Sequence, residues 1–498
     1  MTSINSDFMS QLALRSLGNS SNMMQQAMER LATGKRINSA ADDAAGLGIA
    51  TKLKAQVNSL EAAGRNAADA LALIGTIDGA LEESGEILQR MRELAVQSAS
   101  DSNTGTDRTF IQDEINQLSS ELNRISTATE FNNVKLLDGT YTDKSIQIGT
   151  GANQVFRIGV SATDASTLGA YKRDSATEAL AAVNTYALAT AGLNALYNVG
   201  ADYIIKGSFG TATANVGAGA DARDVARTFN LLSGTTGINA SVITKAQIKA
   251  DAATNFTFTL QGKSTTVSTV NATIANTADM TALKDAVNAV SGSTGIVASL
   301  TEDLSAVNLT QEEGYDIYVA DVTAASGNMT VQAMDAGGTL IGSAITLDAD
   351  GADADSSGVV GQVSLSSHKA FTVQAGNAAN HFATDTAALT SSLNSIGDIT
   401  LASQSGATKA ISVIDAALAQ ISEIRSEMGA AENRLESTVD NISNVAVNTQ
   451  KSLTSVEDAN FASETSQLTK AQILQQAATS MLAQANQAKQ TMLVLLQG

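Results

Sequence analysis

The sequence contains no proline, cysteine or tryptophan, and only 4% of its 498 residues are aromatic. Without cysteine, the chain has no disulfide framework, no thiolate zinc site and no cysteine nucleophile. Basic residues are also few: 30 Lys and Arg stand against 50 Asp and Glu, a net charge of −20. Nucleic acid, which requires a basic surface, is therefore not expected as a partner. No run of about 18 uncharged apolar residues occurs, so we expect no membrane insertion.

Motifs for chemistry are missing as well. The two histidines, His368 and His381, stand outside any metal-ligand motif, and we expect them to be surface groups without a role. Asp42 and Asp43 are expected to cap a helix start rather than to bind a metal. The sequence predicts no enzyme, no metal and no cofactor. The first residues, MTSINSDFMSQ, carry no basic n-region and no apolar h-region, so we also expect no cleaved signal peptide.

Both ends of the chain show the 3-4 spacing of apolar residues that is typical of packed helices. The first run is Leu14, Leu17, Met24, Met28 and Leu31, with the polar Ser21 among them. A second run, 53–88, contains the polar exception Asp78, and a third extends over 111–125. A long run near the end, 411–456, contains the polar exception Arg425. We expect the two ends to pair in a long antiparallel α-helical bundle.

The last segment is apolar on two sides. One stripe includes Leu468, Ala471, Ala478 and Leu482, and a second includes Leu474, Ala477, Met481 and Leu495. The first helical run can cover one stripe, which leaves the other for further copies of the chain or for the middle of the chain. The residues expected to carry assembly are Leu14, Leu17, Met24, Met28, Leu31, Leu468, Leu474, Met481, Leu482 and Leu495.

Between the ends the apolar period changes to two, which predicts small, mostly antiparallel β domains. A hairpin is expected where Ile146 and Ile148, then Phe156, Ile158 and Val160, alternate with other residues on either side of GTGANQ. The predicted fold is therefore α+β and multidomain, with β-rich outer domains inserted between paired terminal helices. The expected domains are an inner assembly domain (1–45 with 455–498), a helical core (46–172 with 402–454) and a surface-exposed insertion (173–401).

The insertion contains an internal repeat. NLLSGTTGINAS at 230–241 aligns with NAVSGSTGIVAS at 288–299, an offset of 58 residues (288 − 230), and each copy follows a short helical segment. We expect two related modules at about 225–282 and 283–340.

The two ends resemble bacterial flagellin. The segments that carry the resemblance are ERLATGKRINSAADDAAGLGIA (29–50), LQRMRELAVQSAS (88–100), EFNNVKLLDG (130–139), NRLESTVDNI (433–442) and ASETSQLTKAQILQQAATSMLAQANQ (462–487). The resemblance implies an extracellular structural subunit that polymerises into the flagellar filament for motility. It also implies type III export and, besides further copies of the chain, three partners: a filament cap, hook-junction proteins and an export chaperone. Departures stand at Val456 and Glu457, where flagellins usually carry arginines, and at Lys489, where a proline is common.

The resemblance also implies contact with the animal flagellin-sensing Toll-like receptor. The matching positions are Gln89, Arg90, Leu94, Gln97 and Glu114, and the same face is expected to contact neighbouring subunits. Two alternatives remain. A hook–filament junction protein shares the terminal helices but usually has a proline at the position of Ala44. A filament whose outer domains act as an adhesin is the other.

Overall fold

The computed structural model describes residues 8–175, 201–217, 220–264, 266–349, 355–375, 382 and 388–497. By its internal contacts the chain divides into two compact units. The first unit consists of Met1–Gly75, Asp143–Gly159 and Gly429–Gly498, and the second of Thr76–Thr142 and Val160–Met428. The two ends of the chain thus belong to the same unit.

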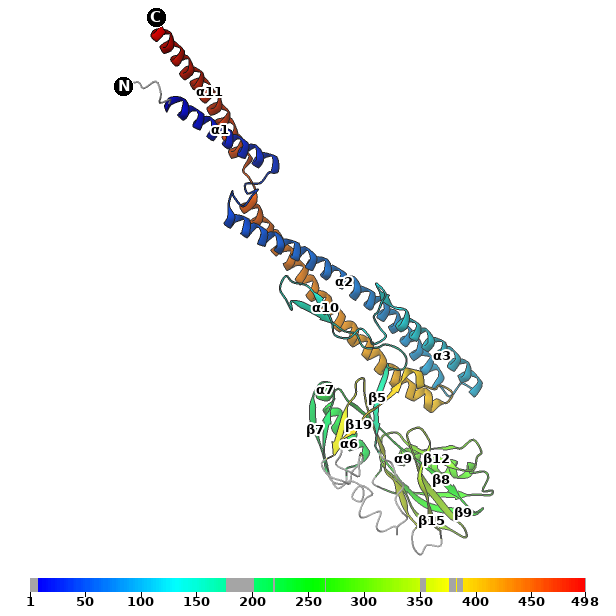
Figure 1. Ribbon diagram of the computed structural model, residues 1–498. Helices are drawn as coiled ribbons and strands as arrows, with labels where there is room; N and C mark the ends of the chain where they lie inside the picture. Colours follow the sequence, from blue (N-terminus) through cyan, green and yellow to red (C-terminus); the bar gives the residue numbers. More distant parts are fainter. Residues whose placement is uncertain are drawn as a thin grey trace. The chain divides into compact units, whose positions relative to one another are not determined.

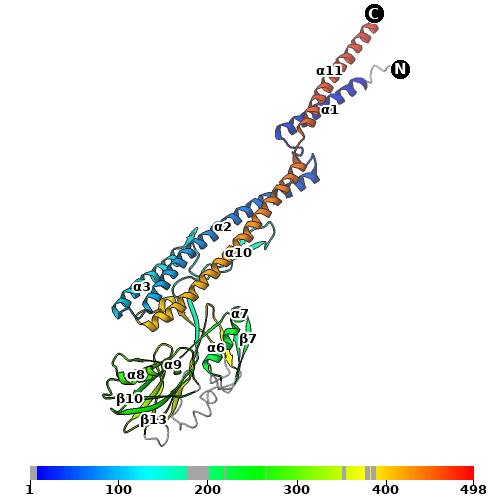
Figure 2. The same ribbon diagram turned by 180° about the vertical axis from the view of Figure 1, so that it is seen from behind.

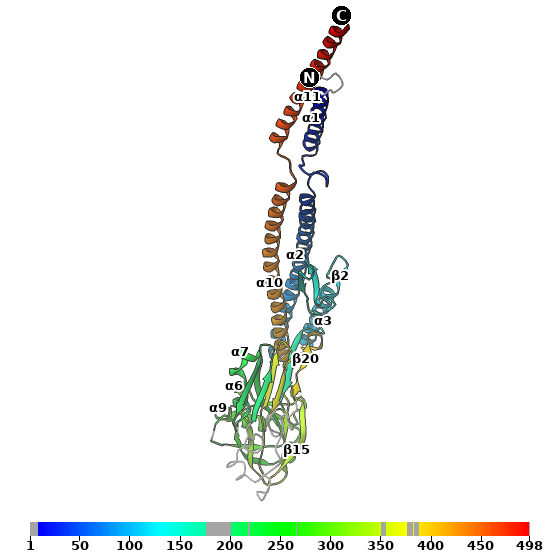
Figure 3. The ribbon, with the colours of Figure 1, turned by 60° about the vertical axis from the view of Figure 1, so that its left-hand side comes forward.

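The long helices come from the two ends of the chain (Figure 1). They are α1 (Phe8–Thr33), α2 (Ala44–Ser98), α3 (Gly105–Ala128), α10 (Gln404–Glu457) and α11 (Phe461–Gln497). Figure 3 shows α1 beside α11 and α2 beside α10. In the first unit Arg30 contacts Glu464, and Gly64 lies opposite Ile442. Further along α2 and α10, Gly85 lies opposite Ile421, so the residue number rises along α2 as it falls along α10, and the predicted antiparallel pairing of the ends is confirmed.

A short break separates α1 from α2, and a second break, between α10 and α11, lies beside it. α1 ends at Thr33 and is followed by Gly34, whose φ of 70° suits glycine, and α10 ends at Glu457. The amide of Arg36 donates to the carbonyl oxygen of Glu457 at 2.7 Å, and the amide of Ala459 donates to that of Gly34 at 2.9 Å. α2 then begins after Asp43, whose carboxylate accepts the amide of Gly46 at 2.8 Å. The two breaks are therefore hydrogen-bonded to each other.

The predicted hairpin is present in the first unit. β3 (Lys144–Gln147) pairs antiparallel with β4 (Val155–Ile158), and Ile146 lies opposite Phe156. The guanidinium of Arg434 lies 5.0 Å from the centre of the Phe156 ring, and the side chain of Asn66 donates to the carbonyl oxygen of Gln147 at 2.9 Å. The hairpin is thus held to both α10 and α2.

The second unit contains the β-rich part of the chain. A small ladder joins β1 (Glu130–Phe131) to β2 (Val134–Lys135). The largest sheet has the order β11-β12-β8-β17-β5-β20, and β14, which pairs with β8, carries β15 at its outer side. Its strands are β5 (Gly169–Asp174), β8 (Asn239–Ala250), β11 (Val297–Leu300), β12 (Val307–Gln311), β14 (Asn328–Met334), β15 (Leu340–Asp348), β17 (Gln362–Ser367) and β20 (Ser392–Ser395).

Two four-stranded sheets accompany it, with the orders β19-β18-β6-β7 and β10-β9-β13-β16. Their strands are β6 (Ala201–Lys206), β7 (Thr211–Val216), β9 (Asn255–Gln261), β10 (Ser268–Thr273), β13 (Ile317–Ala324), β16 (Ser357–Val359), β18 (Thr372–Ala375) and β19 (Leu389–Thr390). A short 3-10 helix, η1 (Ile396–Asp398), precedes α10. Every strand pair in the described ranges is antiparallel, as predicted.

The internal repeat is visible as a repeated β-β-α-α-β unit. The first copy is β6, β7, α6 (Ala222–Leu231), α7 (Ser233–Thr236) and the start of β8; the second is β9, β10, α8 (Thr281–Ala289), α9 (Ser291–Thr294) and β11. Figure 2 shows α8 and β10 of the second copy. The side chain of Asn230 makes two hydrogen bonds to the backbone of Ala240, and Asn288 makes the same two to Ala298. Both asparagines hold the turn that follows their helix onto the next strand.

The repeated unit starts one hairpin earlier than the sequence motif suggests. The expected module boundaries at 225 and 283 fall inside α6 and α8, because the recognisable motif is the turn after the helix and the strands before it differ in sequence. β8 connects the two copies: Ala240 and Val242 pack against the core of the first, and Ala246 and Ile248 lie in the core of the second.

Candidate functional site

The pair formed by α1 and α11 buries one stripe of each helix. On α11 the covered residues are Glu464, Leu468, Ala471, Ala478 and Leu482, which are buried or half-buried. On α1 they are Leu17, Ser20, Met24, Ala27 and Leu31. The prediction that the first helical run covers one stripe of the last helix is confirmed.

A second apolar row stays at the surface of both helices. On α11, Leu474 is 41% and Met481 57% exposed; on α1, Leu14 is 54% and Met28 46% exposed. The side chain of Leu495, predicted to share this row, lies outside the described residues. Contiguous exposed apolar side chains mark a surface on which another molecule packs. The predicted first run therefore divides into two rows, one facing α11 and one facing outward.

Charged contacts tie the two ends together around the helix breaks. Arg30 Nη1 lies 3.4 Å from Glu464 Oε1 in the covered stripe, where the side chains are 19% and 7% exposed. The ammonium of Lys35 pairs with the carboxylate of Glu457, and Arg36 Nη2 donates to the carbonyl oxygen of Val456 at 2.7 Å. Two of the three positions that depart from the flagellin pattern, Val456 and Glu457, are thus engaged by basic side chains of the first helical break.

Arg90 forms the centre of a polar surface on α2 and α3 in the second unit. Its Nη2 and Nε donate to Glu114 Oε1 at 2.8 and 3.0 Å, and its Nη1 donates to Glu93 Oε2 at 3.1 Å. Hydrogen bonding to Glu114, then to Glu93, raises the pKa of Arg90, so this side chain is always charged. Together with the hydrogen bond from Arg108 Nε to the carbonyl oxygen of Ser98 at 2.9 Å, this contact shows that α3 packs antiparallel beside α2. Gln89 and Gln97 are exposed on the same helix.

Leu94 does not share this surface, although it was predicted to. Its side chain is only 2% exposed and belongs to the buried face of α2, together with Leu88, Met91 and Ala95. Residues four apart on a helix differ by roughly 40° around its axis. The edge of the buried face falls between Arg90 and Leu94, and the sequence spacing cannot locate that edge.

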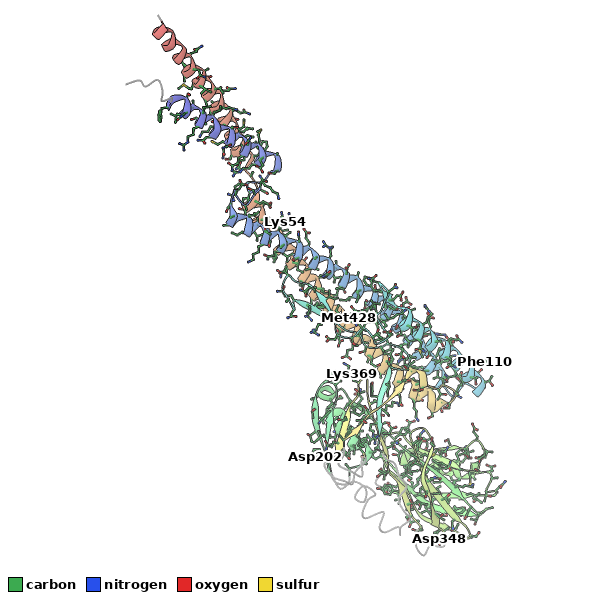
Figure 4. The ribbon with its side chains drawn as sticks, in the orientation of Figure 1. Lys54, Phe110, Asp202, Asp348, Lys369 and Met428 are labelled. Carbon is green, nitrogen blue, oxygen red and sulfur yellow. The ribbon has the colours of Figure 1, made fainter. Side chains whose placement is uncertain are left out.

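Sequence reasoning also missed two exposed apolar side chains on these helices. Phe110 of α3, labelled in Figure 4, is 68% exposed, and Val96 of α2 is 49% exposed. Phe110 directly precedes Ile111, which is buried and begins the regular 3-4 run, so the spacing predicts a role for Ile111 and none for Phe110.

The remaining polar residues of interest have structural surroundings. The prediction that His368 is a surface group is wrong: its side chain is only 18% exposed, and its Nε2 lies 3.5 Å from Glu423 Oε2. His381 lies outside the described residues. Asp43 caps α2 as predicted, whereas Asp42 accepts hydrogen bonds from the loop amides of Ser39 and Asn38, which lower its pKa.

Across the described ranges, no three His, Asp or Glu side chains gather in a way that could hold a metal ion. No helix in that part of the chain has a stretch long and apolar enough to cross a bilayer.

Comparisons with known proteins agree with this geometry. The bacterial flagellin N-terminal helical region matches residues 4–142, the bacterial flagellin C-terminal helical region matches 411–496, and the flagellin hook IN motif matches 255–313. The IN motif begins at the first residue of β9, the start of the second repeated unit in the structure.

Whole-chain relatives point the same way. The B-type flagellin of Pseudomonas aeruginosa is 35% identical over 497 residues, covering 99% of each chain. Flagellin of Clostridium tyrobutyricum is 34% identical and covers 98% of this chain and 100% of its own. Flagellin of Salmonella typhimurium is 32% identical, covering 99% of each chain. The chain therefore belongs to the bacterial flagellin family, as a structural subunit of the extracellular flagellar filament and not an enzyme.

Proposed function

We propose that subunits of this filament join through the outward apolar rows of α1 and α11, in which Leu14, Met28, Leu474 and Met481 are exposed. The observation that carries the proposal is that each helix uses one apolar row inside the pair and leaves a second one open. Covering the open row with another copy removes apolar surface from water. Leu17, Met24, Leu31, Leu468 and Leu482 act within the pair, and Leu495 is assigned to the open row from its sequence position.

We also propose three functional domains. Residues 1–45 with 455–498 form the inner assembly domain, 46–172 with 402–454 the helical core, and 173–401 the outward insertion. The two hydrogen-bonded helix breaks, at 34–43 and 458–460, support the first boundary because both partners of the helical pair stop there.

Truncation tests both proposals. A chain that ends at residue 454 is expected to keep the circular dichroism and thermal unfolding of the β-rich part and to form no filaments in electron micrographs. The matched control is a chain that ends at residue 490 and so keeps most of α11. Filaments from the chain that ends at 454 would contradict the proposal.

We further propose that the chain leaves the cell by flagellar type III export without a cleaved signal, guided by a chaperone, and adds to the filament beneath a cap and beyond hook-junction proteins. The absence of proline supports a route in which the chain unfolds and refolds, because X-Pro isomerisation takes tens of seconds and could delay refolding. Intact mass of the secreted protein tests the signal: a mass lower by an N-terminal segment would contradict it.

Recognition by the animal Toll-like receptor is proposed through Gln89, Arg90, Gln97 and Glu114. Leu94 supports this surface from inside, because its side chain is buried. Arg90→Asp is expected to weaken receptor activation about thirtyfold, since a planar guanidinium in an interface commonly contributes about 2 kcal/mol. A reporter-cell titration measures this, with Arg124→Asp, an exposed arginine of α3, as the control. Equal activation by both variants would contradict the proposal.

A further inference from the structure

The second unit contains a large polar cavity that the assembly function does not use. Its volume is about 830 Å³, and it is lined by residues of β5, β8, β12 and β17 and by the first turns of α10. Small-molecule sites commonly have volumes of about 300–1,000 Å³.

Three lysines from three different elements line this cavity: Lys172 of β5, Lys245 of β8 and Lys409 of α10. In the part of the chain that the structure describes, none of them has a carboxylate oxygen within 4.0 Å. Lys172 Nζ donates to the hydroxyl of Ser412 at 2.8 Å, and Lys245 Nζ donates to the carbonyl oxygen of Ala336 at 3.1 Å. Neutral acceptors therefore hold two of the ammonium groups, and no counterion neutralises them at close range.

The electrostatics of the lysines are unfavourable without a ligand. Burial lowers the pKa of Lys172 and Lys245, and the charge of Lys409 lowers both further. Asp174 opposes this effect at Lys172, and Asp335 and Glu312 oppose it at Lys245, all from beyond ion-pair distance.

The carboxylates of the lining are themselves partly engaged. Glu313 pairs with Lys263 at 2.6 Å, and Asp174 accepts a hydrogen bond from the hydroxyl of Ser364.

The rest of the lining is rich in hydroxyl and amide groups, among them Ser241, Thr310 and Asn394. Gln311 also lines the cavity, and its side chain is 1% exposed. Its Oε1 is buried out of reach of a molecule in the cavity, so the hydroxyl and amide groups named above are the ones that a bound molecule can meet.

We propose that this cavity binds an acidic sugar, with its carboxylate or phosphate between Lys172, Lys245 and Lys409 and its hydroxyl groups toward the serine, threonine and asparagine side chains of the lining. Charge-assisted hydrogen bonds from ammonium groups to an oxyanion are the strongest that these residues can form. A neutral sugar would leave the three ammonium groups without an oxyanion, and a bare inorganic anion would leave the hydroxyl and amide groups of the lining without a partner.

Calorimetric titration of the full-length monomer tests the proposal with four probes: glucuronate, glucose 6-phosphate, glucose and inorganic phosphate. We expect one or both acidic sugars to bind, and glucose and inorganic phosphate to bind at least about tenfold more weakly. The tighter of the two acidic sugars identifies the oxyanion as carboxylate or phosphate. Glucose binding as tightly as the acidic sugars, or no binding by either acidic sugar at millimolar concentration, would overturn the proposal.

Variants locate the site. Lys409→Gln, at an exposed position on α10, is expected to weaken binding roughly 10- to 100-fold. Lys451→Gln, an exposed lysine further along α10, is the matched control. Mass spectrometry after reductive methylation gives a second readout, in which the acidic sugar protects Lys172 and Lys245 in the unmutated chain. Equal affinity of Lys409→Gln and Lys451→Gln, without such protection, would place any binding elsewhere and overturn the assignment.

Discussion

Replacing Met481 by glutamine tests the assembly surface most directly. Met481 lies in the open row of α11 and is 57% exposed, so the substitution removes little packing from the subunit itself. Glutamine has a similar length and a high helix propensity, which keeps α11 intact. Whatever effect appears must therefore arise when another subunit covers the side chain.

The magnitude follows from this exposure. Full burial of a methionine side chain contributes about 1.5–3 kcal/mol, and slightly more than half of the side chain is still available for burial. Assembly would gain about 1–1.5 kcal/mol from Met481, and the buried amide of glutamine would add a desolvation cost of about 1 kcal/mol. The sum of about 2 kcal/mol corresponds to a roughly thirtyfold rise in the critical concentration for filament growth.

Sedimentation of seeded filaments at increasing subunit concentration measures this value. Met481→Leu is the matched control, because it keeps an apolar side chain of similar volume and is expected to change the critical concentration by only a few-fold. The thermal unfolding of all three monomers should agree. An unchanged critical concentration for Met481→Gln would refute the reasoning, since the open row would then face solvent in the filament too.

Three further predictions concern other parts of the chain. Joining residue 172 to 402 through a short Gly/Ser linker should still give filaments in electron micrographs, and aggregates or monomers alone would make the insertion part of assembly. Asn288→Ala should destabilise the β-rich part by about 2–4 kcal/mol in denaturant unfolding, because Ala298 is 5% exposed and its backbone amide and carbonyl would lose their hydrogen-bond partners. Asn230→Ala should cost only about 1 kcal/mol, because Ala240 is half-buried. Equal costs for the two variants would contradict this difference. Leu94→Met should keep receptor activation, whereas Leu94→Ala should lose about 2–5 kcal/mol of stability; loss of activation by a stable Leu94→Met would restore Leu94 as a direct contact.

The helical part of the fold could be predicted because its information is local and periodic. The two stripes of α11 follow from spacing alone, and the structure covers Leu468, Ala471 and Leu482 while exposing Leu474 and Met481. A helix pair has few alternative arrangements once each apolar row is known.

What the sequence could not supply was the edge of each buried face. Whether Leu94 is buried and Phe110 exposed depends on how far the contact with a neighbouring helix extends around each helix. The packing of several helices determines this extent, and the spacing of apolar residues along one helix does not show it. The frame of the repeat was missed for a similar reason. In each copy the turn after the helix ends at a glycine with positive φ, Gly237 in the first copy and Gly295 in the second, and this requirement leaves a sequence signature. The hairpins that precede the helices tolerate many side chains.

The polar exceptions in the two long apolar runs meet each other in the structure. Arg425 Nε and Nη2 donate to the two carboxylate oxygens of Asp78 at 2.8 and 3.2 Å, and Gly85 lies opposite Ile421 in the same register. The hydrogen bond to Asp78 raises the pKa of Arg425, so the guanidinium stays charged. Both side chains are about 40% exposed, and such a pair contributes only about 0–1 kcal/mol.

The pair therefore matters more for register than for stability. The other residues of the two runs are mostly interchangeable aliphatic side chains, which also match after a slip of seven residues. Such a slip places Asp78 opposite Glu432 in one direction and Leu418 in the other, so it brings like charges together or removes the partner of a charge. Arg425→Leu should then unfold at nearly the same denaturant concentration but allow more than one register. Because the chain has no cysteine of its own, a cysteine pair at 85 and 421 reports this directly. Complete cross-linking in the Arg425→Leu background, equal to that with Arg425 present, would show that packing alone sets the register.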